Sequence, residues 1–157
     1  MNFLTEHDIG SYEELVERCD AVSVASIRTR ESLRDTEQWI ADLAILGKQI
    51  DTYRKLKPVY DRYKESKDKE KFLRGFESEI ILFEAAAREI KKAGLTKLLS
   101  SEKLKTELDG LAARKTALQA ELRKIQRKEK EYDTLRQNVG DLLFSSKKKH
   151  EMELDFY

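Results

Sequence analysis

A row of apolar residues recurs at every seventh position between residues 104 and 139, and it constrains the fold more than any other feature of the chain. The row consists of Leu104, Leu111, Leu118, Ile125, Tyr132 and Val139. Such spacing is typical of a long amphipathic helix, whose seam must pack against another helix. A second row, four residues after each member, is apolar at only half of its positions: Leu108, Lys115, Leu122, Glu129, Arg136 and Leu143. This imperfection favours a mixed intramolecular hairpin over a regular zipper.

The composition points to the same class of fold. The 157 residues are 39% charged and 39% hydrophobic, and aromatic residues make up 8%. This supplies little apolar material for a compact sphere, whereas long helices need only a narrow apolar stripe and many charged residues. We therefore expect an all-α protein: an elongated, coiled-coil-like antiparallel hairpin of long helices, with a shorter third helix packed near one end.

Capping and breaking residues divide the chain into three helices. Ser11 followed by Glu14 is a capping box, in which the hydroxyl and the carboxylate each accept from a main-chain amide. Pro58 has no amide hydrogen, so the first helix is expected to kink or end near Leu56. Gly94 suits the end of the middle helix because glycine adopts positive φ at little cost. We predict helices at about 11–57, 68–93 and 101–144.

These helices are expected to form one elongated domain over residues 1–144. The apolar periodicity fails after Phe144, and the residues that follow are polar with segregated charges. We therefore predict a flexible charged tail at 145–157.

The apolar faces of the helices predict the packing core. The middle helix is rich in aromatic residues and is expected to cover the second half of the first helix, where Trp39, Leu46 and Tyr53 widen the stripe at a spacing of seven. The predicted core comprises Leu33, Trp39, Ile40, Leu43, Ile50, Phe72, Phe76, Ile80, Phe83, Leu104, Leu108, Leu111, Leu118, Leu122 and Ile125.

No pattern of residues indicates chemistry. His7 and His150 are the only histidines and lie far apart, with no glutamate three residues before either. The glycines are isolated, and no serine has a histidine base nearby in the sequence. The single Cys19 lies on a helix seam, where a small core residue is favoured over a reactive thiol. We expect no catalytic residue, no metal and no cofactor, and hence no enzyme.

A basic segment invites comparison with nucleic-acid-binding proteins. Residues 114–130 contain only two acids, Glu121 and Glu129. Seven residues of the segment are basic: Arg114, Lys115, Arg123, Lys124, Arg127, Lys128 and Lys130. These side chains suit a phosphate backbone. The favoured alternative is a solvated face whose acids lie on a neighbouring helix, because no aromatic residues interleave to stack on bases. With a net charge of +1, any DNA contact of this chain alone is expected to be weak and non-specific.

The sequence contains no signal for a membrane or for export. No apolar run approaches the ~20 residues that cross a bilayer. The N-terminal residues MNFLTEHDIG lack a basic stretch followed by an apolar one. We expect a cytoplasmic protein that makes no membrane contact.

Five stretches of the chain resemble a known family. They are NFLTEH (2–7), GSYEEL (10–15), YRKLKPVYDRY (53–63), KEKFLRGFESEIILFEAAAREIK (69–91) and YDTLRQNVGDLL (132–143). Together they are similar to the C-terminal helical region of relaxases, the mobilization nucleases of conjugative and integrative elements in Gram-positive bacteria. The resemblance covers most of residues 2–143 and is most specific in its middle segment. Gly140 departs from it, since such relatives carry an acidic residue there.

The resemblance implies a function in conjugative DNA mobilization without catalysis. In this family a tyrosine nucleophile and a histidine-hydrophobe-histidine metal motif belong to an N-terminal domain, and this chain lacks that motif. No tyrosine here should inherit the nucleophile role. The chain is then an accessory or interaction domain that acts in plasmid or transposon transfer. The residues by themselves leave a second function open, a coiled-coil scaffold or adaptor with no DNA role. A protein partner or self-association is expected in both cases.

Overall fold

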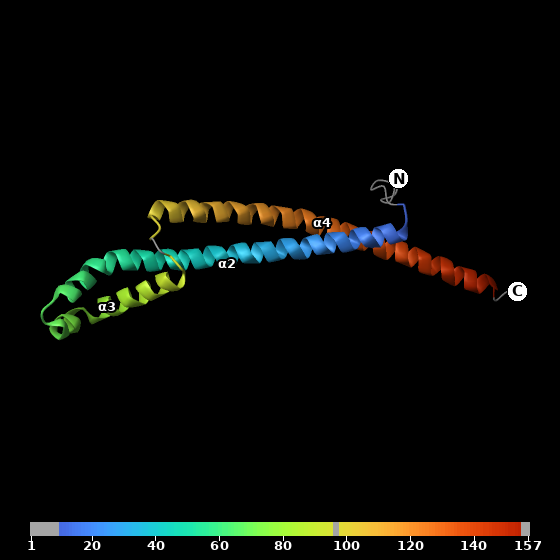
Figure 1. Cartoon of the computed structure of the whole chain (residues 1–157). Helices are drawn as coiled ribbons and strands as arrows, with labels where there is room; N and C mark the ends of the chain where they lie inside the picture. The colour runs from blue at the N-terminus through green and yellow to red at the C-terminus, as the bar shows by residue number, and fades with distance from the viewer. Residues whose placement is uncertain (1–9, 96–97, 155–157) are drawn as a thin grey trace. The chain divides into compact units, whose positions relative to one another are not determined.

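The computed structural model describes residues 10–95 and 98–154, and these form three helices. In chain order they are α2 (Tyr12–Glu65), α3 (Lys69–Lys92) and α4 (Ser101–Leu154), as Figure 1 shows. No strand occurs among the described residues. The predicted all-α class is confirmed.

The chain folds as two compact units. The first lies within Met1–Arg34 and Thr116–Tyr157, and the second is Asp35–Lys115. Both long helices therefore contribute to both units, while α3 belongs to the second alone. We expected one domain over residues 1–144. The two units arise because apolar core residues gather in two separate clusters, each within one unit.

The core of the first unit joins the beginning of α2 to the later part of α4. Leu15, Cys19 and Tyr132 are buried together. Partly buried apolar side chains surround them: Val22, Leu135 and Val139. Burying this set stabilises the unit by roughly 25 cal/mol for each Å² of apolar surface removed from water.

The core of the second unit joins all three helices. Leu43 and Ile50 of α2, Ile90 of α3 and Leu104 of α4 are buried together. The two long helices run antiparallel here, as predicted: Gly47 lies next to Leu104, whereas Glu37, earlier in α2, pairs with Lys115, later in α4.

The start of α2 is capped largely as the sequence predicts. The amide of Glu14 donates to Ser11 Oγ over 3.1 Å. The Glu14 carboxylate accepts from the amide of Gly10 at 2.9 Å, one residue before the amide that a standard capping box would use. Both bonds satisfy amides that have no partner inside the helix.

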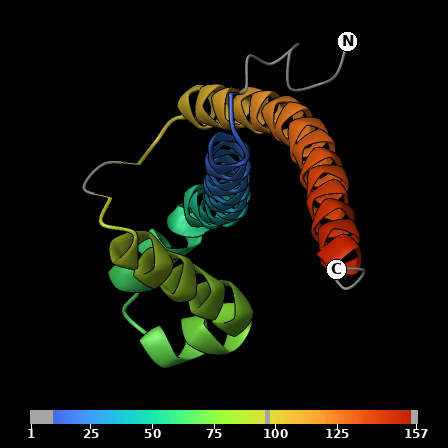
Figure 2. The same ribbon diagram turned by 90° about the vertical axis from the view of Figure 1, so that its right-hand side faces the viewer.

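Pro58 does not end α2, so of the two outcomes predicted near Leu56, a kink or an end, the end is wrong. The helix continues to Glu65 with Pro58 inside it. Residues beyond the proline are held by aromatic contacts with α3, including Tyr63 against Phe72 with ring centroids 6.2 Å apart. This packing offsets the main-chain hydrogen bond that proline removes. Figures 1 and 2 both show α3 folded back beside this part of α2.

The middle helix has clear caps and one interruption. Asp68 accepts from the amide of Lys71 at 3.1 Å, and Gly94 follows the helix with φ of 75°. Phe76 departs from helical geometry, with φ −133° and ψ 27°. The preceding Gly75 weakens the helix at this point. Phe76 is 39% exposed, and its prediction as a core residue is wrong.

The last helix is longer than the sequence analysis predicted. Ser100 caps it by accepting from the amide of Lys103 at 3.2 Å. The predicted end at residue 144 is wrong, since α4 continues to Leu154. Residues 145–154 contain no glycine or proline and several good helix formers, which allows the helix to run on without an apolar stripe.

The predicted core is confirmed in part. Leu43, Ile50, Ile80, Phe83 and Leu104 are buried. Others are half-buried: Leu33, Ile40, Phe72, Leu108, Leu111, Leu118, Leu122 and Ile125. Trp39 is wrongly predicted, because it is 59% exposed. Leu46 and Tyr53 of the same row pack against the core cluster that includes Ile90 of α3, but α3 ends at Lys92 and Trp39 lies one heptad earlier in α2.

Candidate interaction surfaces

The described residues contain no arrangement that suits catalysis or metal binding. No group of three or more His, Cys, Asp or Glu side chains among them lies close enough to hold a metal ion. His7 lies outside the described residues, and His150 lies on α4 without a described side chain. Tyr53 and Tyr60 both stack on Phe83, at 4.7 and 4.4 Å between centroids, so they serve packing. That the chain is not an enzyme stays a prediction.

Cys19 is a core residue, as the sequence predicts. Its side chain is only 4% exposed, and its Sγ donates to the main-chain oxygen of Tyr132 over 3.7 Å. Burial raises the pKa of the Cys19 thiol because the thiolate is poorly solvated in the core. The group is therefore a poor nucleophile.

A polar network lies beside this core. Arg18 Nη2 donates to Glu14 Oε1 at 3.0 Å. A hydrogen bond with the Tyr132 side chain is the main cause that raises the pKa of Arg18. The amide of Gly10 lowers the pKa of the Glu14 carboxyl. The bond between Arg18 and Tyr132 ties α2 to α4 within the first unit.

The seam of α2 contains buried polar residues in its middle. Ser26, Thr29 and Thr36 are all buried. Ser26 Oγ is buried without a hydrogen-bond partner among the described residues, and so is Glu129 Oε2 on α4. None of the three is in the predicted core. A spacing of seven predicts the two threonines as seam residues. Thr29 and Thr36 stand between Leu15 and Val22 on one side and Leu43 and Ile50 on the other in one row.

The basic segment divides into one paired residue and six exposed ones. Lys115 Nζ lies 3.7 Å from Glu37 Oε1 and is half-buried. Exposed side chains make up the rest: Arg114, Arg123, Lys124, Arg127, Lys128 and Lys130. None of these six makes an ion pair with any residue that the structure describes. The expected acids on a neighbouring helix are thus found for Lys115 alone.

Five of these residues form a continuous basic face of α4, which we define as Arg123, Lys124, Arg127, Lys128 and Lys130. Arg123, Arg127 and Lys130 follow the spacing i, i+4, i+7 and so share one side of the helix. That side is opposite the apolar seam. Neutral residues continue it in both directions: Thr116, Gln119, Thr134 and Gln137. One carboxylate, that of Glu131, lies on the same side at i+4 from Arg127 and i+3 from Lys128, but it forms no ion pair with a described residue.

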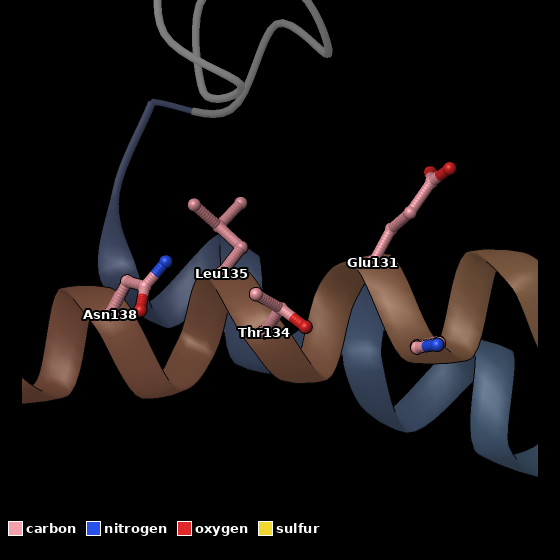
Figure 3. A pocket seen from close by; sticks show the side chains of 5 residues that line it. Glu131, Thr134, Leu135 and Asn138 are labelled. Atoms are coloured by element: carbon pink, nitrogen blue, oxygen red, sulfur yellow. The ribbon is translucent and has the colours of Figure 1, made fainter.

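The hollows of the described surface are shallow. Figure 3 shows one on α4, lined by Lys130, Glu131, Thr134, Leu135 and Asn138. All five residues come from one helix, so no groups converge on it from two sides. A second hollow, between α2 and α4 in the second unit, carries two lysines and two aspartates: Lys48, Lys105, Asp51 and Asp109. These charges cancel, and neither hollow is a substrate pocket.

Several large apolar side chains are exposed instead. Trp39 and Ile45 of α2 are 59% and 58% exposed. Leu142, Leu143 and Phe144 are exposed at consecutive positions of α4. Exposed apolar groups that gather on one surface are typical of protein interfaces.

None of the described helices contains a stretch long and apolar enough to cross a bilayer. Comparison with known proteins gives no match to a family model, a curated protein or a solved structure.

Proposed function

We propose that the chain is a non-catalytic helical interaction module that contacts the DNA backbone during conjugative mobilization, as the accessory region of a relaxase. The observation that carries this proposal is the basic face of α4, whose five cations have no acid partner among the described residues. Such a face binds phosphates by releasing their counterions. The module acts in the cytoplasm, where the DNA is.

The spacing of the basic face fits a phosphate backbone. Arg123 and Lys130 are separated by seven residues, or about 10 Å along an α-helix. Phosphates of one DNA strand recur every ~3.4 Å along the duplex axis and turn about it, so long basic side chains spread over this length can reach consecutive phosphates. No aromatic side chain lies on the face, and base stacking is therefore not part of the contact. Binding should depend on charge and not on sequence.

Residues 53–63 and 69–91, two of the stretches that resemble relaxases, pack on one another through stacked rings. Tyr53 and Tyr60 of the first stretch contact Phe83 of the second. Two of the five resembling stretches thus pack within one unit. In this proposal the nicking chemistry comes from another domain or protein.

A scaffold or adaptor without a DNA role is the second candidate function. The exposure of Trp39 favours it, because tryptophan is enriched at the energetically dominant positions of protein interfaces. The two functions differ in what they require of the basic face.

Binding of labelled duplex and single-stranded DNA to the purified chain tests the proposal. In about 50 mM salt we expect Arg123→Ala/Arg127→Ala/Lys130→Ala to weaken binding at least tenfold. The matched control removes the same charge from exposed positions of the second unit: Lys67→Ala, Arg88→Ala and Lys91→Ala. An equal loss in both variants would mean that total charge governs binding. Absence of binding by the unaltered chain would leave the adaptor as the better account.

A further inference from the structure

A second surface, on the second unit, combines exposed apolar groups with unpaired acids. We define the Trp39 surface by Trp39, Ile45, Asp35 and Asp42. Trp39 belongs to the row that continues through Leu46 and Tyr53, both of which pack against the core cluster that contains Ile90 of α3. Because α3 stops at Lys92, the first member of the row remains largely exposed. The Trp39 surface is therefore continuous with a helix-binding face that is already in use.

The charge of this surface is negative. Asp35 and Asp42 lie four residues before and three residues after Trp39, on the same side of α2. Neither forms an ion pair with a described residue, although Gln38 Nε2 donates to Asp42 Oδ1 at 2.9 Å. Lys92 at the end of α3 lines the same hollow as Asp42, and it pairs with Glu89 at 3.5 Å.

The Trp39 surface contains a hollow that can accept a side chain of a partner. A hollow lies where α2 meets the end of α3, lined by Asp42, Ile45, Leu46, Glu89, Lys92 and Ala93. Ile45, Leu46 and Ala93 are its apolar lining residues, and Asp42 is one of its charged ones. Trp39 lies three residues from Asp42, so one helix could contact both the ring and the hollow.

We propose that the Trp39 surface binds a basic amphipathic helix of a partner protein. Apolar side chains of that helix cover Trp39 and enter the hollow, while its lysines or arginines pair with Asp35 and Asp42. A cation over the indole ring would add a cation–π contact. A second copy of this chain fits less well, because a two-fold axis near Trp39 would place Asp35 of one copy close to Asp42 of the other, and the two carboxylates would repel. This inference does not depend on DNA contact.

The intrinsic fluorescence of the chain reports binding directly, since Trp39 is its only tryptophan. The probe is a synthetic helical peptide with leucines at i, i+3, i+4 and i+7 and lysines beside them, and the control peptide has glutamate at each lysine. We expect the lysine peptide to shift the Trp39 emission to shorter wavelength. Asp35→Asn/Asp42→Asn should weaken this binding about tenfold. Glu77→Gln/Glu84→Gln, which neutralises two exposed acids of α3, should change it little.

Three results would overturn the proposal. The first is an unchanged emission spectrum with the lysine peptide. The second is equal binding of both peptides, which would mean that the charges of the surface do not favour a basic peptide over an acidic one. The third is a blue shift that grows with protein concentration in the absence of peptide, together with a dimer mass that Ile45→Ser abolishes. That result would identify a second copy as the occupant.

Discussion

The ring of Phe83 stacks on the ring of Tyr60 with 4.4 Å between centroids, and so links α3 to the part of α2 that follows Pro58. Tyr53, which precedes the proline, also stacks on the ring of Phe83, with 4.7 Å between centroids. One phenylalanine therefore contacts α2 on both sides of a residue that usually breaks helices. This relationship explains why α2 extends to Glu65.

Loss of the Phe83 ring should destabilise the second unit strongly. Phe83→Ala removes a buried aromatic side chain and is expected to cost about 3–5 kcal/mol in the free energy of unfolding. Ile81→Ala, at an exposed position of the same helix, should cost less than ~1 kcal/mol. Urea denaturation followed by circular dichroism measures both. Similar small losses would mean that the stacked rings do not hold the helices together.

The thiol of Cys19 should react slowly in the folded protein. Burial raises its pKa, so at pH 8 the thiolate fraction falls below that of a free cysteine, whose pKa is about 8.5. Because the folded-state pKa is the higher one, the stability that this group contributes is lost as pH rises above the unfolded value. Modification by a chromogenic disulfide should be at least tenfold slower than in urea.

A control for this measurement places a thiol on the surface. Ser78→Cys in a Cys19→Ser background puts the cysteine at an exposed position of α3. This variant should react at nearly the same rate in buffer and in urea. Equal reactivity of native Cys19 in the two solvents would show that it is accessible.

Removal of the Ser26 hydroxyl should stabilise the first unit. Ser26 Oγ is buried without a hydrogen-bond partner among the described residues, and an unsatisfied buried polar atom carries a desolvation penalty of about 1–3 kcal/mol. Ser26→Ala removes that penalty. Ser23→Ala, at an exposed position of α2, isolates the gain in helix propensity that both changes share. The midpoint of thermal unfolding should rise more for Ser26→Ala, and a fall below the control would contradict this reading.

Local sequence signals predicted the helices and most of their starts. Ser11, Asp68 and Gly94 act through residues a few positions away, so their capping could be read from the sequence. Helix ends were harder. The continuation past Pro58 depends on contacts with a helix that follows later in the chain. α4 continues past residue 144 because the residues there have sufficient helix propensity, although the apolar periodicity has stopped.

The surfaces depended still more on tertiary structure. The row that contains Trp39 predicts a contact, yet only the point at which α3 ends determines which members are covered. The basic segment likewise predicts a charged face, but whether acids neutralise it depends on the register of α2 against α4. That register places Glu37 beside Lys115. The apolar periodicity of a single helix does not determine how that helix is aligned along its partner.

The salt dependence of DNA binding tests the central claim most directly. If Arg123, Arg127 and Lys130 contact three phosphates, the slope of log K against log salt should be about −2.7, since each contact contributes about −0.9. Raising the salt from about 50 to 200 mM would then weaken duplex binding about 40-fold. The triple alanine variant should lose most of this slope. An unchanged slope in that variant, or no binding by the unaltered chain at the lower salt concentration, would contradict the assignment of the basic face to DNA.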